Sequence, residues 1–127
     1  MERLLKVSEQ HVWVGVEDHR VFLGLTNYVQ SELGQIISVE LPEVGDEVER
    51  GESFAELESI ATVSELIAPV SGTVLAVNAD LEDHPGMINE DPYNEGWLIE
   101  VELRDESEIQ SLMDMDEYYH FVFKPRP

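Results

Sequence analysis

Short runs of alternating apolar and polar residues fill the first three quarters of the chain. The run over residues 11–16 places Val12, Val14 and Val16 on one face and Trp13 on the other, as expected for a β-strand. Turn-forming residues and a second apolar run follow it, which predicts a hairpin. The same reasoning predicts strands at residues 11–16, 20–25, 36–41, 44–48, 53–58, 64–68, 72–77 and 97–103.

One helix interrupts these strands. Thr26 is a suitable N-cap, Tyr28 and Leu33 are apolar positions at helical spacing, and Gly34 is a suitable stop. The remaining strands are short, about ten residues apart and separated by Gly and Pro, a spacing typical of a sandwich or barrel.

The C-terminal part of the chain changes to helical spacing. Asp105 with Glu108, and Asp114 with Glu117, have the spacing of capping boxes, and apolar residues follow each pair at helical intervals. We therefore expect two short helices, packed on the sheet, at about residues 105–122.

Charge adds the strongest compositional signal. The 127 residues include 28 acidic and 7 basic side chains, for a formal net charge of −21. Such a surface repels phosphate backbones and anionic lipids, so we expect neither nucleic acid nor membrane partners. The charge can serve solubility, or it can steer the protein onto basic partner surfaces, and the two roles are compatible.

Several other classes of protein are disfavoured. The chain has no cysteine, which excludes disulfides and thiolate chemistry and suits the cytoplasm or an organelle matrix. No apolar run is long enough to cross a bilayer, and the N-terminus lacks a signal-peptide pattern. The four histidines have no metal-ligand spacing, and no serine or carboxylate pair has a catalytic setting. We expect no metal site, and we expect His11 to pack or hydrogen-bond beside Trp13.

Four motifs occur in order and are spread over residues 11–99 of the chain. They are His-Val-Trp-Val at 11–14, Val-Glu-Leu-Pro-Glu-Val-Gly-Asp at 39–46, Glu-Ser-Ile-Ala-Thr at 58–62 leading to Ala-Pro-Val-Ser-Gly at 68–72, and Asn-Glu-Asp-Pro-Tyr at 89–93 followed by Glu-Gly-Trp-Leu-Ile at 95–99. By these motifs the chain resembles the H proteins of the glycine cleavage system.

The resemblance implies one H-protein-like domain over residues 1–127. Its fold would be mainly β, a lipoyl/biotinyl-carrier-like flattened barrel of two small antiparallel sheets with short added helices, including the C-terminal segment. Proteins of this family are carriers rather than enzymes. A lysine at a hairpin tip carries lipoate, which takes an aminomethyl group from the decarboxylase, delivers its carbon to the aminotransferase and is reoxidised by lipoamide dehydrogenase.

The tip position of that hairpin is occupied here by Ala61. The flanks fit the family's lipoylation pattern without a gap, with Glu58 three residues before and Gly72 eleven residues after. Alanine has no amine, and the only lysines are Lys6 and Lys124. We therefore predict that this chain is not lipoylated and carries no cofactor.

A second departure concerns the cleft that holds the loaded arm in the family. The resemblance places Val12 where a glutamate usually helps to bind the arm, while Glu65 retains the acidic character of the other cleft position. Loss of both arm and cleft residue favours a natural paralogue over an engineered substitution at residue 61.

Three functions stay open at this point. The first is a glycine-cleavage H protein whose carrier position is lost. The second is a non-lipoylated binding or regulatory paralogue that docks on glycine-cleavage enzymes, lipoate-attachment enzymes or a lipoate-dependent redox complex. The third is a structural subunit of another assembly. In each case we expect a cytoplasmic monomer without an active site of its own.

Overall fold

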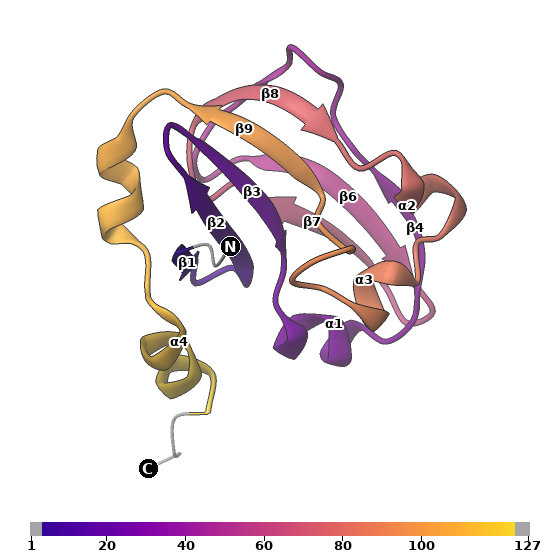
Figure 1. The fold of residues 1–127 in the computed structure, drawn as a ribbon. Helices are drawn as coiled ribbons and strands as arrows, with labels where there is room; N and C mark the ends of the chain where they lie inside the picture. The colour runs from indigo at the N-terminus through magenta and orange to yellow at the C-terminus, as the bar shows by residue number, and fades with distance from the viewer. Residues whose placement is uncertain (1–3, 124–127) are drawn as a thin grey trace.

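Two antiparallel β-sheets form the body of the protein in the computed structural model, which describes residues 4–123 (Figure 1). The predicted mainly β fold, with two sheets and short added helices, is confirmed. The larger sheet has the strand order β1 (Leu4–Val7), β2 (Val12–Glu17), β3 (Arg20–Leu25), β9 (Ile99–Leu103), β8 (Gly72–Val77), β5 (Glu47–Val48). The smaller sheet has the order β4 (Ile36–Glu40), β6 (Ser53–Ser59), β7 (Val63–Ile67).

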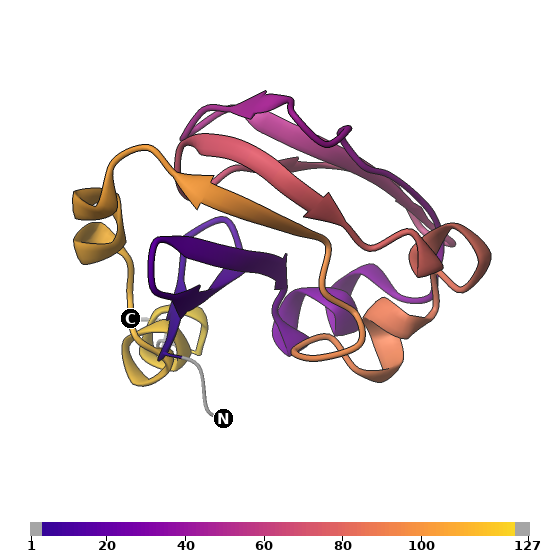
Figure 2. The same cartoon turned by 45° about the horizontal axis from the view of Figure 1, so that its top comes forward.

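The hydrophobic core draws aliphatic side chains from both sheets. In Figure 2 the strands of the smaller sheet lie above β2, β3 and β9 of the larger one. Val14 and Val101 from the larger sheet, and Leu57 from the smaller, are at most 1% exposed. Burying a side chain of this kind contributes about 1.5–3 kcal/mol relative to leaving it exposed. The alternation in the sequence therefore identified the core strands correctly.

Strand β2 is buried on both faces. Trp13, which the alternation placed on the face opposite Val12 and Val14, is fully buried as they are. Its register partner on β3 is Gly24, where a Cβ atom would lie only 2.5 Å from the indole. The indole Nε1 donates to the carbonyl of Pro92 at 2.9 Å. The missing side chain at residue 24 therefore makes the room that this tryptophan fills.

Helix α1 (Asn27–Leu33) has the predicted caps. The Thr26 hydroxyl accepts a hydrogen bond from the Val29 N–H at 3.2 Å, and Gly34 ends the helix at φ +80°, where glycine avoids strain. Three other short elements were not predicted, because a run of four residues shows no clear period. They are β1, α2 (Asp80–Asp83) and α3 (Met87–Glu90).

The C-terminal helices agree only partly with prediction. Helix α4 (Met115–Val122) has the capping box of Asp114 and Glu117. The preceding segment is a 3₁₀ helix, η1 (Glu106–Ser111), and Asp105 caps it alone. The predicted Asp105/Glu108 box is therefore wrong. The Glu108 carboxylate instead accepts hydrogen bonds from Ser71, from the backbone N–H at 2.7 Å and the hydroxyl at 3.1 Å, and so fastens η1 to the start of β8.

The chain then runs back beside the first strand. Val7 and Met113 exchange two backbone hydrogen bonds, of 2.7 and 2.9 Å, and α4 packs next to β1. No helix within residues 4–123 is long and apolar enough to span a bilayer.

Candidate functional site

The tip of the β6–β7 hairpin is the exposed feature on which the sequence hypothesis depends. Residues 60–62 connect the two strands and are all exposed, and the tip lies at the same end of the molecule as α1 and α3 (Figure 1). The side chain of Ile60 is 68% exposed and that of Val63 is 59% exposed. The expected exposure of Ala61 is confirmed.

Ser59 fixes the backbone of this tip. Its hydroxyl oxygen accepts hydrogen bonds from the N–H groups of Ala61 and Thr62, both at 3.2 Å, and the serine is only 4% exposed. The Ser59 and Ile60 N–H groups donate to the carbonyls of Thr62 and Gln35 at 2.8 and 3.0 Å. Residue 61 is therefore presented to solvent on a turn held from both sides.

The two residues that flank the tip in the family pattern have different environments. Glu58 is exposed on the outer face of the small sheet. Gly72 is buried where β8 meets β9, and a Cβ atom there would collide with the carbonyl oxygen of Glu102 and with Val101. Close packing of two strands is thus sufficient reason for glycine at residue 72.

Glutamates line up across the outer face of the small sheet. The strand registers place Glu56 opposite Glu40 on one side and opposite Glu65 on the other, and all three are exposed. No ion pair among residues 4–123 involves them. Like charges directly opposite each other destabilise a sheet, and they concentrate negative potential on this face. We call these three residues the glutamate row.

Val12 does not occupy the surface position expected for it. The side chain is fully buried in the core, and its register partner is Leu25. The assignment of Val12 to a surface cleft is therefore wrong for this structure. A glutamate at this position would put an unpaired carboxylate in the core, at a cost of several kcal/mol. Glu65 belongs to the glutamate row, and a role for it in holding an arm stays a prediction.

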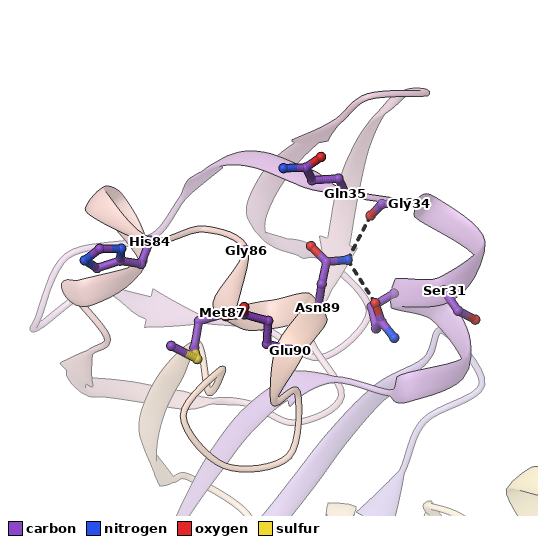
Figure 3. A pocket seen from close by; sticks show the side chains of 9 residues that line it. Ser31, Gly34, Gln35, His84, Gly86, Met87, Asn89 and Glu90 are labelled. Atoms are coloured by element: carbon purple, nitrogen blue, oxygen red, sulfur yellow. Dashed lines mark hydrogen bonds between the residues drawn. The ribbon is translucent and has the colours of Figure 1, made fainter.

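A hollow of about 540 Å³ lies next to the hairpin tip, between the end of α1 and helix α3 (Figure 3). Asn89 lines this hollow. Its side-chain amide nitrogen donates to Gln30 Oε1 and to the Gly34 carbonyl, both at 2.9 Å, and its side-chain oxygen accepts from the Ile36 N–H at 2.9 Å. One side chain thus joins α3, α1 and β4 behind the tip. The sequence alone did not indicate this role, because the partners of Asn89 lie 53 to 59 positions away along the chain.

A chain of hydrogen bonds connects the C-terminal helix to the first hairpin. The buried Tyr118 hydroxyl lies 2.8 Å from His11 Nδ1 and 2.8 Å from the Thr26 hydroxyl. Burial lowers the pKa of His11 and raises the pKa of Tyr118 to about 12. The histidine therefore bonds to Tyr118, and not beside Trp13 as expected. No cluster of His, Asp or Glu within residues 4–123 is arranged to hold a metal.

The lowered pKa of His11 predicts a pH dependence of stability. In the unfolded chain His11 takes up a proton near pH 6.5, whereas the folded protein favours the neutral ring. Keeping the ring neutral therefore costs no stability above pH 6.5. As the pH falls through and below 6.5, the unfolded chain gains a proton that the folded protein resists, and stability is lost. We expect wild type to lose more stability between pH 7.5 and 5.5 than His11→Asn, a variant that tolerates the positive φ of residue 11. Urea unfolding at both pH values measures this. Equal losses in the two proteins would contradict it.

Comparisons with known proteins extend over nearly the whole chain. A family model described as Glycine cleavage H-protein matches residues 5–124. The chain is 54% identical over 118 residues to the glycine cleavage system H protein of Halalkalibacterium halodurans, covering 93% of this chain and 92% of that protein. It is 51% identical over 118 residues to the protein of the same name from Staphylococcus saprophyticus, covering 93% and 94%. A crystal structure of a glycine cleavage system H protein from Mycobacterium marinum matches with a TM-score of 0.88 and 35% identity, over 97% of this chain and 99% of that one.

Proposed function

Because the chain belongs to the glycine cleavage H-protein family, we propose that it is a non-lipoylated member that acts by docking on enzymes that also bind lipoylated H proteins. The observation that carries the proposal is the methyl group of Ala61 at an exposed tip whose backbone is hydrogen-bonded to Ser59. A lipoyl amide needs a primary amine, which alanine lacks. Lys6 cannot substitute, because it lies in β1 opposite Val14 and not on this hairpin.

The rest of the hairpin supports docking. Its turn is held by Ser59, its flank Glu58 is exposed, and the turn is anchored to the segment after α1 through Ile60 and Gln35. Ile60 at the tip is a large, exposed apolar side chain. Exposed apolar side chains of this kind favour association with another protein. Binding without chemistry is the function that fits these features.

The partners that we propose are the glycine-cleavage aminotransferase and the lipoate-attachment enzyme. Both would meet this face of a lipoylated or lipoate-accepting H protein. The glutamate row and the net charge of −21 favour a basic docking surface on the partner. Decarboxylase and lipoamide dehydrogenase are further partners of the same kind.

Competition with a lipoylated H protein tests the proposal. We expect the chain to inhibit the aminotransferase or the attachment enzyme at 0.1 M salt, and the inhibition to weaken by roughly tenfold or more at 1 M salt. The reason is that the Debye length falls from about 10 Å to about 3 Å over this range. Steady-state rates at the two salt concentrations measure the effect. No inhibition of either enzyme at low salt would reject docking.

A charge-matched pair of variants locates the surface. Glu40→Gln, Glu56→Gln and Glu65→Gln together remove the glutamate row and are expected to abolish most of the inhibition. The control removes three exposed charges elsewhere and is expected to inhibit like wild type. Its substitutions are Glu82→Gln, Asp83→Asn and Glu95→Gln. Equal loss in both variants would mean that net charge, and not this face, drives the encounter.

A further inference from the structure

Aromatic side chains are exposed at the end of α4, on the side of the molecule opposite α2 (Figures 1 and 2). Tyr119 is 45% exposed, Phe121 is 43% exposed and Phe123 is 62% exposed. Three large aromatic groups exposed within five residues are unusual on a protein surface, and aromatic residues are enriched in binding interfaces.

Two of these rings combine with Tyr28 of α1. The rings of Tyr119 and Phe123 lie 6.1 Å apart and nearly parallel, at 23°, while Tyr28 stands at 88° to Phe123 with 5.5 Å between centroids. The rings therefore form a corner with two walls. We call Tyr28, Tyr119 and Phe123 the aromatic corner.

Buried hydrogen bonds fix the two helices that carry the aromatic corner. Tyr118, the neighbour of Tyr119, is fully buried, and its hydroxyl bonds to Thr26 and His11. Thr26 in turn caps α1, the helix that carries Tyr28. The two helices that supply the rings are thus connected through one buried hydroxyl, so a ligand would meet a preorganised surface.

Carboxylates border the corner on both helices. Asp116 lies three residues before Tyr119 and seven before Phe123, so these side chains share one face of α4. Glu32 lies one turn after Tyr28 on α1. Both carboxylates are exposed, and no ion pair within residues 4–123 involves either of them.

This combination fits one chemical group better than others. Ring faces attract cations, and unpaired carboxylates do so as well. A guanidinium group is planar, stacks on aromatic rings and binds carboxylates through two parallel hydrogen bonds, which an ammonium group does not do. We propose that the aromatic corner binds an arginine side chain on the surface of a partner protein. The proposal does not depend on residue 61 or on the glutamate row.

An NMR titration with a capped pentapeptide, acetyl-Gly-Gly-Arg-Gly-Gly-amide, tests the proposal on the full-length protein. We expect chemical-shift changes at Tyr28, Tyr119 and Phe123. The same peptide with lysine in place of arginine should bind with a Kd several-fold higher. The peptide with uncharged citrulline at that position should show no saturable binding. Shifts spread over the glutamate row, or equal binding of the arginine and lysine peptides, would overturn the proposal, because either result would indicate unspecific charge attraction.

Two matched variants test the role of the rings. Phe123→Leu keeps an apolar side chain but removes the ring, and we expect the Kd for the arginine peptide to rise about three- to tenfold. Phe121→Leu makes the same change on the same helix at a ring outside the corner and should leave the Kd unchanged. Equal effects of the two variants would overturn the assignment. The assignment would also be overturned if the arginine peptide bound only after Arg126→Gln, because Arg126 of this chain, and not a partner's arginine, would then be the ligand of the aromatic corner.

Discussion

Replacing Ala61 by lysine is expected to turn the chain from a protein that takes up no lipoate into one that is fully modified. The substitution adds an amine at an exposed position whose backbone is held by Ser59 and whose flanks, Glu58 and Gly72, keep the family spacing. Residues 60–62 are exposed, so a longer side chain at residue 61 would extend into solvent. Intact mass after co-expression with a lipoate ligase and free lipoate should rise by one lipoyl group for Ala61→Lys and stay unchanged for wild type.

A lysine one residue further on serves as the matched control. The hydroxyl of Thr62 donates to the carbonyl of Val63 at 3.3 Å, so residue 62 is exposed like Ala61 but lies one position off the family spacing from Glu58 and Gly72. We expect Thr62→Lys to be modified far less than Ala61→Lys. A lipoyl mass gain in wild type would show that another residue accepts the group and would end the non-lipoylated hypothesis. An unmodified Ala61→Lys would show that the tip has lost the features that the ligase requires.

Gly72→Ala should cause a large loss of stability. The new methyl would collide with the carbonyl of Glu102, and backbone in the middle of β9 cannot rotate away as a side chain can. Inserting a methyl group into a well-packed site costs about 1–3 kcal/mol, and rigid neighbours place this site at the upper end. Against a total stability of about 5–15 kcal/mol for a domain, the change in urea midpoint should be large.

Gly86→Ala provides the comparison for this prediction. Residue 86 has φ −63°, and no atom lies within 4 Å of a Cβ added there. Alanine should therefore be neutral, or stabilising by up to about 1 kcal/mol through the unfolded chain. If both variants unfolded at the same urea concentration, the sheet would be able to open between β8 and β9, and the glycine at residue 72 would need another explanation, such as recognition by a ligase.

The sequence by itself determined the features that depend on near neighbours. The alternation of apolar residues identified eight of the nine strands found within residues 4–123, and the caps at Thr26 and Gly34 defined α1. The tip at Ala61 followed from the resemblance to the H-protein family, together with the predicted strands on either side of it. These features are local, because a cap, a turn or a strand face is set by hydrogen bonds and side chains a few residues apart.

Only the tertiary structure decided where distant residues meet. Glu108 has the spacing of a capping residue, but its carboxylate bonds to Ser71, 37 positions away. His11 pairs with Tyr118 across 107 positions. The alternation placed Val12 on one face with Val14, but only the tertiary structure pairs it with Leu25 and buries it in a core that both sheets share.

The glutamate row and the aromatic corner show the same limit at the surface. Glu40, Glu56 and Glu65 become neighbours only through the register of three strands, and a shift of one residue would turn them to the other face. Tyr28 and Phe123 meet because a buried hydroxyl joins two helices from opposite ends of the chain. A sequence states which side chains are available, and the packing of the sheets and helices decides which of them can act together.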